Sequence, residues 1–216
     1  MQFQTPLMQA TLIRRYKRFL ADIRLDGGTE VTAHCANPGA MTGLKDQGLR
    51  IWVEQNDDPK RKLDYSWKLV ELPNAHWVGI DTGMPNRVVE AALSRGHVSD
   101  LAAYKTLRRE VKYGENSRID FLLSQSGLPD AYVEVKAVTL RRTGDLAEFP
   151  DSVTTRGTKH LNELVNMTKL GHRAIMLYAV HRTDCHSFKV AAAFFSVCHM
   201  RPCPMRRKAK ARQCSA

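Results

Sequence analysis

Apolar and polar residues alternate along much of the N-terminal part of the chain. Phe19, Ala21, Ile23 and Leu25 occupy every second position of one segment, which is the pattern of a strand with one buried face. Turn sequences such as Asp-Gly-Gly and Asn-Pro-Gly separate this strand from its neighbours. The predicted strands cover residues 19–25, 30–34, 49–53, 65–70 and 76–80. Short strands at this spacing, with no helical pattern among them, predict a small β-barrel in residues 1–82.

The pattern becomes helical after the turn sequence at residues 81–86. Asn86 is expected to cap a helix that ends at Gly96. Further helices are predicted over residues 100–107 and 158–170, strands over 110–113, 119–123 and 132–138, and a strand buried on both faces over 174–180. This order predicts a compact α/β domain in residues 83–216, after the barrel.

Two acidic residues face each other in the hairpin predicted for residues 118–138. If the hairpin is symmetric about Gly127, Asp120 lies directly opposite Glu134. Lys136 then shares the face of Glu134, because side chains alternate between the two faces of a strand. Like charges at opposed positions are destabilising. Because Mg²⁺ binds carboxylates, keeps its waters and contacts phosphate oxygens, we expect Asp120 and Glu134 to hold Mg²⁺, with Mn²⁺ as the alternative.

These residue types suggest metal-assisted hydrolysis of a phosphodiester. Lys136 is expected to orient or help deprotonate the attacking water, and Glu110, on the preceding strand, to be a third ligand or a base. The predicted catalytic residues are therefore Asp120, Glu134, Lys136 and Glu110. The alternative is a solvated pair of carboxylates with Lys136 as their salt-bridge partner, since such short patterns recur by chance.

Basic residues in both predicted domains are candidates for binding a nucleic-acid backbone. The predicted set is Arg14, Arg15, Lys17, Arg18, Arg118, Arg156, Lys159 and His160. The last three lie at the start of a predicted helix, where backbone N–H groups favour phosphate. Trp52, Tyr65 and Trp67 are either stacking platforms for bases beside the first four cations or part of the barrel core.

Asp120 and the Glu134-Val-Lys136 sequence resemble the Asp…(Asp/Glu)-X-Lys core of the restriction-endonuclease-like nuclease superfamily. More narrowly, the chain is similar to the sugar fermentation stimulation protein family. The matching stretches are Lys17-Arg-Phe19, His34-Cys-Ala-Asn-Pro-Gly39, Asp81-Thr82, Pro85-Asn86, Glu110-Val-Lys-Tyr-Gly114, Ser117-Arg-Ile-Asp-Phe-Leu122, Tyr132-Val-Glu-Val-Lys-Ala-Val-Thr-Leu140, Phe149-Pro-Asp151 and Arg156-Gly-Thr-Lys-His-Leu161.

The resemblance implies an oligonucleotide/oligosaccharide-binding (OB) barrel followed by a nuclease-like α/β domain. It also implies a DNA-binding protein associated with regulation of sugar (maltose) use. Residues 187–216 depart from the family pattern: the chain reads Val190-Ala-Ala-Ala-Phe-Phe-Ser-Val-Cys198 and then becomes rich in Cys, Pro and Arg. We interpret this departure as a shift of reading frame.

Composition limits the remaining possibilities. The chain has 216 residues and a net charge of +11, which favours polyanionic partners, although residues 187–216 contain basic residues and no acidic one. The 5 cysteines are scattered, and no long apolar segment or signal sequence is present, so we expect a cytoplasmic protein that does not bind membranes. The sequence has no Gly-rich phosphate loop, so no nucleotide cofactor is expected. A homodimer remains open.

Three functions therefore remain for the sequence. The preferred one is a DNA-binding protein with a Mg²⁺-dependent nuclease site. The first alternative is a regulator that binds DNA without cleaving it and in which the carboxylates are structural. The second is an enzyme that acts on RNA and uses the barrel to bind single strands.

Overall fold

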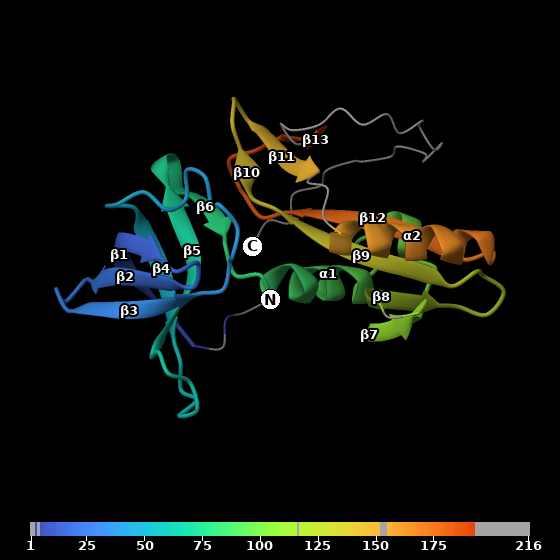
Figure 1. Cartoon of the computed structure of the whole chain (residues 1–216), viewed down its shortest axis with the longest axis horizontal. Coiled ribbons are helices and arrows are strands. Elements are labelled where there is room, and N and C mark those ends of the chain that lie inside the picture. Colours follow the sequence, from blue (N-terminus) through green and yellow to red (C-terminus); the bar gives the residue numbers. More distant parts are fainter. Residues whose placement is uncertain (1–2, 4, 116, 152–154, 193–216) are drawn as a thin grey trace.

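The computed structural model describes residues 3, 5–115, 117–151 and 155–192. A β-barrel formed by the N-terminal residues lies at one end of the molecule, and a sheet flanked by helices lies at the other (Figure 1). Helix α1 (Met84–Ser94) follows the last strand of the barrel. The chain is thus an OB-like barrel followed by an α/β domain, the order that the sequence predicts.

The barrel contains strands β1 to β5, with β6 added at the edge of β5. These strands are β1 (Leu7–Tyr16), β2 (Leu20–Leu25), β3 (Glu30–Cys35), β4 (Arg50–Gln55), β5 (Tyr65–Leu72) and β6 (His76–Gly79). Antiparallel neighbours follow the order β3-β2-β1-β4-β5, and a parallel pairing of β3 with β5 closes the barrel. A short 3₁₀ turn, Pro73–Ala75, connects β5 to β6.

Strand β1 was absent from the predicted strands. Its pairing with β2 shifts between Leu12 and Arg14, and such a bulge breaks the alternation by which a strand is recognised. Phe19, predicted to point into the barrel, precedes β2 and is 45% exposed. It stacks on the ring of His34, with the ring centroids 6.4 Å apart.

The tryptophans of the barrel have structural partners. Trp67 is 1% exposed and belongs to the barrel core with Leu12, Ile23 and Ile51. Trp52 is half-buried, and its indole N–H donates to the carboxylate of Glu71 at 2.9 Å. The rings of Trp52 and Trp77 meet in an edge-to-face arrangement. Tyr65 packs against the same core. The core interpretation therefore holds for Trp67 and Tyr65, and Trp52 lies at the margin of the barrel.

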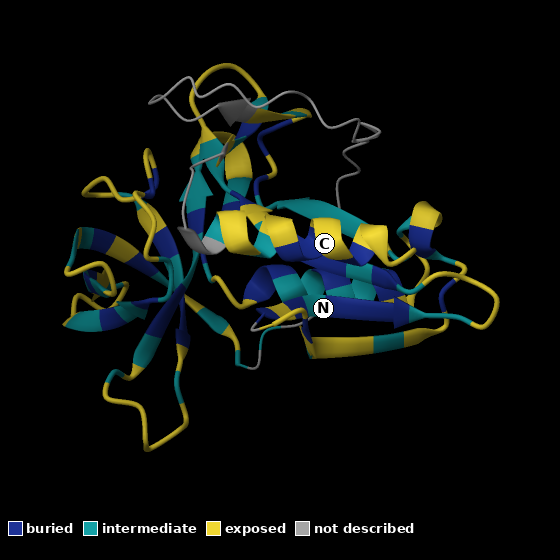
Figure 2. Cartoon of the chain, turned by 45° about the vertical axis from the view of Figure 1, so that its right-hand side comes forward, coloured by how far each residue is buried: buried dark blue, intermediate teal, exposed yellow. Residues whose placement is uncertain are grey.

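The α/β domain is built on a four-stranded sheet in the order β12-β9-β8-β7. Its elements are α1, the 3₁₀ turn η2 (Ser99–Leu101), β7 (Thr106–Tyr113), β8 (Ser117–Ser124), β9 (Ala131–Val138), α2 (Thr155–Lys169) and β12 (Arg173–Val180). Val89 and Leu93 of α1 pack with Phe121 and Val133 on one face. Leu164 and Met167 of α2 pack on the other face, and the opposite side of α2 is exposed (Figure 2).

Three local predictions for this domain are wrong. The helix predicted over residues 100–107 is a 3₁₀ turn followed by β7, because residues from Thr106 onward pair with β8. Asn86 is not a cap: α1 starts at Met84, with Gly83 before it. The strand predicted to be buried on both faces, β12, is an edge strand whose residues are mostly half-buried.

A third, small sheet contains β10 (Leu140–Arg141), β11 (Leu146–Asp151) and β13 (Ser187–Ala192). Strand β13 lies parallel to β11. The predicted departure from the family pattern starts in β13, and residues 193–216 lie outside the described part of the chain. No helix of the described ranges is both long and apolar enough to traverse a bilayer.

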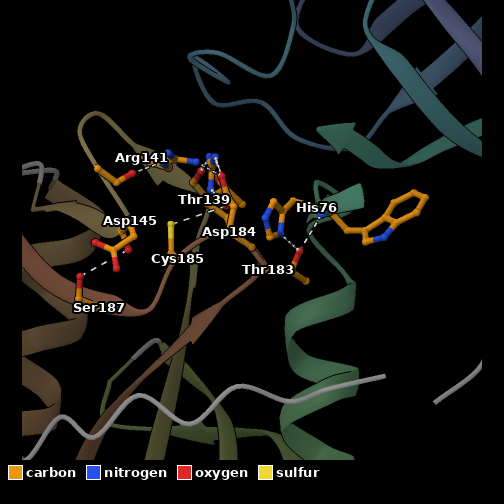
Figure 3. A network of polar contacts seen from close by, with 11 residues as sticks. His76, Thr139, Arg141, Asp145, Thr183, Asp184, Cys185 and Ser187 are labelled. Atoms are coloured by element: carbon orange, nitrogen blue, oxygen red, sulfur yellow. Dashed lines mark hydrogen bonds and ion pairs between the residues drawn. The ribbon is translucent and has the colours of Figure 1, made fainter. Parts of the chain in front are cut away.

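The segment after β12 joins the barrel to the α/β domain (Figure 3). The amide of Thr183 donates to the carbonyl of Trp77 at 3.0 Å, and the amide of Gly79 donates to the carbonyl of His181 at 3.0 Å. Val78 and Arg182 form an antiparallel bridge between these bonds. Backbone hydrogen bonds thus join the edge strand of the barrel to the second domain. Because hydrogen bonds are directional, they fix the orientation of this segment against β6.

A buried ion pair supports this junction. Arg182 is 8% exposed and donates to both oxygens of Asp184, each at 2.9 Å, and to the carbonyl of Thr139. Arg141 also contacts Asp184. Burial by itself raises the pKa of Asp184, but the hydrogen bonds from Arg182 and Arg141 outweigh it and hold the pKa below its usual range.

We expect Asp184→Asn to destabilise the protein by about 1.5–3 kcal/mol at pH 7, because Arg182 loses a charged hydrogen-bond partner in a buried position. The pKa of Asp184 is lower in the folded state than in the unfolded state, so its contribution is complete above the ordinary carboxyl pKa of about 4 and is lost as the pH falls through the folded value. Thermal unfolding between pH 7 and pH 2 checks this. The difference between the wild type and Asp184→Asn should shrink below pH 4, whereas exposed Asp26→Asn should change little at any pH.

Candidate functional site

The hairpin of β8 and β9 has the register expected for symmetry about Gly127. Phe121 pairs with Val133, Leu122 with Tyr132, and Leu123 with Ala131. The ladder ends at the Phe121–Val133 pair, one position before Asp120 and Glu134. A regular hairpin would pair these two acidic residues directly. In the structure they are not paired and lie where the two strands separate.

Asp120 is held in the opening between the strands. One carboxylate oxygen accepts the backbone N–H of Val135 at 2.7 Å, and the other accepts the side-chain amide of Asn86 at 2.8 Å. Residues two positions apart in a regular strand share one face of the sheet. Phe121 instead packs on the α1 side and Ile119 on the α2 side, so the alternation of β8 is interrupted at Asp120. The Asp120 carboxylate thus replaces a backbone acceptor of β8 and is oriented by the first turn of α1.

Glu134 is buried beneath two nitrogen groups. It is 6% exposed, and one carboxylate oxygen lies 2.8 Å from Lys136 Nζ and 3.4 Å from His160 Nδ1. The Lys136 side chain is 30% exposed, so it contacts the buried carboxylate and remains accessible to solvent. His160, predicted to contact phosphate, comes from α2 and lies against Glu134.

Tyr113, at the end of β7, is a buried tyrosine whose hydroxyl feels the charge of several carboxylates. Its side chain is buried, and its hydroxyl has no hydrogen-bond partner in the described structure. Burial, followed by the negative charges of Glu134, Glu163 and Asp120, raises the pKa of Tyr113 well above its usual value. Three carboxylates from β9, α2 and β8 therefore act on one buried hydroxyl.

Glu163, Tyr113 and Asn86 were not among the predicted site residues. Glu163 is 7% exposed and comes from α2, one turn after His160. That spacing places the two side chains on the same side of a helix, and it was the only signal in the sequence that could have identified Glu163. Tyr113 resembles an ordinary core aromatic, and Asn86 resembles a helix cap, so neither carries a local signal of the site.

Glu110 lies on β7 between the Arg109–Phe121 and Val111–Ile119 pairs, at the position across from Asp120. It is exposed and has a positive φ of 50°. Its carbonyl accepts a hydrogen bond from Arg118 at 3.2 Å, while its carboxylate has no polar partner among the described residues. Within those residues, no group of three or more His, Cys, Asp or Glu side chains is close enough to enclose a metal ion.

Asp120 and Glu134 are still suitable for a hard divalent cation. Both supply carboxylate oxygens. Mg²⁺ is usually bound through one or two carboxylates and keeps several of its waters. Each oxygen of Asp120 accepts one hydrogen bond and retains a second lone pair. The Tyr113 hydroxyl and one Glu163 oxygen are also buried and have no hydrogen-bond partner in the described structure.

The basic residues of the barrel fall into two groups. Arg14 forms an ion pair with Asp22 at 2.7 Å, and Arg15 donates to the carbonyls of Arg18 and Asn37. Lys17 forms the tip of the β1–β2 turn with Arg18. Both have positive φ angles and are exposed, and neither has an acidic partner in the described part of the chain.

The predicted cations of the α/β domain come from β8 and α2. Arg118 is exposed on β8, and Lys159 is exposed on α2. Lys159 lines an open hollow of about 730 Å³ between α2 and the β7–β8 turn, together with Gly114 and Glu163. Arg156 lies in the first turn of α2.

The fold and this site define a class of two-domain proteins in which an OB barrel precedes an α/β domain. The central hairpin of that domain carries two carboxylates, Asp120 and Glu134, where its strands separate. The family model described as "SfsA N-terminal OB domain" matches residues 13–80. The model "Sugar fermentation stimulation protein RE domain" matches residues 83–197. The chain belongs to the sugar fermentation stimulation protein family.

Relatives and one solved structure agree with this assignment. The sugar fermentation stimulation protein homolog of Ruegeria pomeroyi (strain ATCC 700808 / DSM 15171 / DSS-3) is 65% identical over 192 residues, which cover 89% of this chain and 84% of the relative. That of Ruegeria sp. (strain TM1040) is 62% identical over 89% of this chain and 83% of the relative. The structure of Pyrococcus furiosus SfsA in complex with Ca²⁺ is 25% identical and has a TM-score of 0.76, covering 88% of this chain and 79% of that chain.

Proposed function

We propose that this protein binds DNA and hydrolyses its phosphodiester bonds with the help of Mg²⁺ at the opening of the β8–β9 hairpin. The observation that carries the proposal is the buried Glu134 carboxylate, 2.8 Å from Lys136 Nζ, next to the fixed carboxylate of Asp120. Burial of a charged carboxylate costs free energy unless the group is paired. Glu134 has the ammonium of Lys136 beside it, whereas Asp120 accepts only neutral N–H groups, so the two carboxylates retain negative charge for a further cation.

The proposed metal ligands are Asp120 and Glu134. The Pyrococcus furiosus relative was solved with Ca²⁺, and Ca²⁺ and Mg²⁺ both prefer carboxylate oxygens, which supports a divalent cation here. A bound divalent cation would polarise the phosphate and lower the pKa of a water.

The protein supplies orientation and charge around such a cation. Asn86 and the Val135 amide fix both oxygens of Asp120. Lys136 remains partly exposed and can orient a water toward the phosphate while it balances the negative charge of the transition state. Arg118 and Lys159 are exposed close to this hairpin, where they can bind the flanking phosphates.

Removal of the metal tests the proposal. We expect the purified full chain to cleave DNA in Mg²⁺ or Mn²⁺ and to lose cleavage, but not binding, in EDTA. The assay uses supercoiled, linear, branched and single-stranded DNA, analysed on gels and, for binding, by fluorescence anisotropy. Binding without cleavage of any of these substrates in either metal would contradict the hydrolytic proposal.

The second candidate is a regulator that binds DNA without cutting it. The observation in its favour is that both oxygens of Asp120 already accept hydrogen bonds from the protein, so that this carboxylate also has a structural function. The same assay separates the two, because the regulator binds DNA and is inert in every metal. Competition between RNA and DNA of equal sequence tests the RNA alternative, which a clear preference for DNA would eliminate.

Lys17 and Arg18 are expected to bind DNA phosphates from the barrel. The logarithm of the DNA association constant K falls linearly with the logarithm of the salt concentration. Removal of one cation that neutralises a phosphate makes this slope less steep by about 1. The double variant Lys17→Ala/Arg18→Ala should therefore bind DNA more weakly and lower the slope by about 2. Titrations between about 50 and 200 mM salt, a range over which such binding changes steeply, measure this change.

The matched control is Arg24→Ala/Arg50→Ala. It also removes two positive charges from the barrel, but these belong to arginines that are paired with Glu30 at 2.7 Å and Glu71 at 3.3 Å. Its slope should stay close to that of the wild type. Equal slopes for the two double variants would show that the β1–β2 turn does not bind phosphate specifically.

A further inference from the structure

A second buried acid, Glu163, lies on the α2 side of the hairpin. The side chain is 7% exposed, and its Oε2 atom is fully buried without a hydrogen-bond partner in the described structure. Packing of Leu164 and Met167 against the sheet fixes the rotation of α2, and His160, three residues earlier, reaches Glu134. The helix therefore directs Glu163 toward the sheet and away from solvent.

A second polar group without a partner lies close to Glu163. Tyr113 is 6% exposed, and its hydroxyl is fully buried. Glu163 packs on Gly114, the residue that follows Tyr113, and the negative charges of Glu134, Glu163 and Asp120 all raise the pKa of this hydroxyl. The large majority of buried polar groups in native proteins have a hydrogen-bond partner, and exceptions indicate a water or an ion. Two such groups beside two further carboxylates point to a hydrated cation.

Gly114 allows Glu163 to reach this position. A Cβ atom at residue 114 would lie 2.9 Å from Glu163 Cδ and 3.1 Å from its Cγ, and the φ of Gly114 is +56°. The carboxyl group thus packs directly on the backbone of the β7–β8 turn, where a larger residue would displace it. The place of Glu163 is determined by both the turn and the helix.

We propose that Glu163 is a third acidic residue of the divalent-cation site, binding the ion through the waters of its hydration shell, with the Tyr113 hydroxyl as a donor to the same shell. This inference rests on the proposed function, because it takes Asp120 and Glu134 as the direct ligands. It agrees with the finding that, in the described ranges, no three acidic or histidine side chains have the spacing of direct ligands. Mg²⁺ commonly keeps several waters and is bound through one or two carboxylates.

The charge of the cluster also favours this role. Asp120, Glu134 and Glu163 contribute three negative charges that act on Tyr113, against the ammonium of Lys136 and the imidazole of His160 beside Glu134. A divalent ion would offset the excess negative charge without further side chains. Glu163 would then occupy the third acidic position for which the sequence suggested Glu110.

Manganese binding to the full chain tests the inference independently of cleavage. Free Mn²⁺ is measured by electron paramagnetic resonance for the wild type, Glu163→Gln, Glu134→Gln and the control Glu115→Gln. Residues around metal ligands typically change metal affinity about 10- to 100-fold when mutated. Glu163→Gln should therefore weaken Mn²⁺ binding by about 10-fold, and Glu134→Gln should weaken it more. Glu115→Gln, an exposed acid on the same hollow, should leave it unchanged.

Each result separates the inference from the proposed function. Wild-type affinity in Glu163→Gln, with weakened binding in Glu134→Gln, would overturn the role of Glu163 and leave the direct ligands in place. Failure of the wild type to bind Mn²⁺ would overturn both. Circular dichroism shows whether Glu163→Gln is folded. If it is not, Tyr113→Phe decides: a decrease in affinity smaller than that expected for Glu163→Gln supports the shared hydration shell, and unchanged affinity contradicts it.

Discussion

Replacement of Asp120 by asparagine is expected to reduce Mg²⁺-dependent DNA cleavage by at least about 100-fold, since even residues that surround metal ligands change activity by about 10- to 100-fold. Asparagine has nearly the same shape but no charge, and its amide nitrogen cannot accept the hydrogen bonds that Asn86 and the Val135 amide donate to the two Asp120 oxygens. The variant therefore lacks the anionic metal ligand and one of the two orienting hydrogen bonds. Cleavage rates at saturating DNA, together with DNA affinity by anisotropy, measure the two effects separately.

The control for this variant is Asp130→Asn. Asp130 belongs to the loop of the same hairpin, and its backbone carbonyl, rather than its carboxylate, accepts the amide of Arg173. Cleavage and binding should both remain close to those of the wild type. DNA affinity should also remain in Asp120→Asn, because lysine and arginine side chains bind the phosphates. Full cleavage by Asp120→Asn would contradict the proposed site.

Lys136 is expected to matter for the rate more than for binding. Lys136→Met keeps most of the aliphatic stem but removes the ammonium that lies 2.8 Å from Glu134. General acid–base groups contribute on the order of 10²- to 10⁴-fold to rates, so a decrease in this range is expected at unchanged protein fold. A regulator without catalytic activity would show the same lack of cleavage in the wild type and in both variants.

Phe121→Ala is expected to destabilise the protein by about 3–5 kcal/mol, the usual cost of removing a buried phenylalanine side chain. Phe121 is 0% exposed, forms the last rung of the β8–β9 ladder with Val133, and packs with Val89 and Leu93 of α1. The cavity would lie directly beside Asp120. Denaturant unfolding measures the change, and Phe121→Leu should cost less because more of the volume is kept.

Phe19→Ala is the matched control. The residue type and the substitution are the same, but Phe19 is 45% exposed and stacks on the ring of His34 at the barrel surface. Its removal should change the free energy of unfolding by no more than about 0.5 kcal/mol. Equal destabilisation by the two variants would contradict the assignment of Phe121 to the core and Phe19 to the surface.

Elements with a strong local pattern could be predicted from the sequence. The hairpin register about Gly127 follows from two apolar strands and a short turn. The helix predicted over residues 158–170 is α2, three residues longer at its start. Strand β1 escapes prediction because a bulge interrupts its alternation. The composition of residues 100–107 permits a helix, whereas the segment begins with a 3₁₀ turn and pairs with β8 from Thr106 onward.

The candidate site shows the same division. Asp120, Glu134 and Lys136 could be predicted because they belong to one hairpin, where the period of a strand relates them. The spacing from His160 places Glu163 on one side of α2, but only the packing of α2 on the sheet buries it against Gly114. The sequence suggests Glu110 as a third acidic residue of the site because it lies on the strand before that of Asp120. In the structure its backbone has a positive φ and its side chain is exposed.

The sequence by itself determined the order of the two domains, the register of the hairpin and the choice of carboxylates and lysine at its end. These properties depend on residues that are close along the chain, and the alternation of side chains carries them. Only the tertiary structure decided that the strands separate at Asp120, that α1 and α2 reach the opening from opposite faces, and that Arg182 and Thr183 join the second domain to the barrel. Those interactions connect residues far apart in the sequence, and they form only when packing fixes the position and rotation of each helix on the sheet.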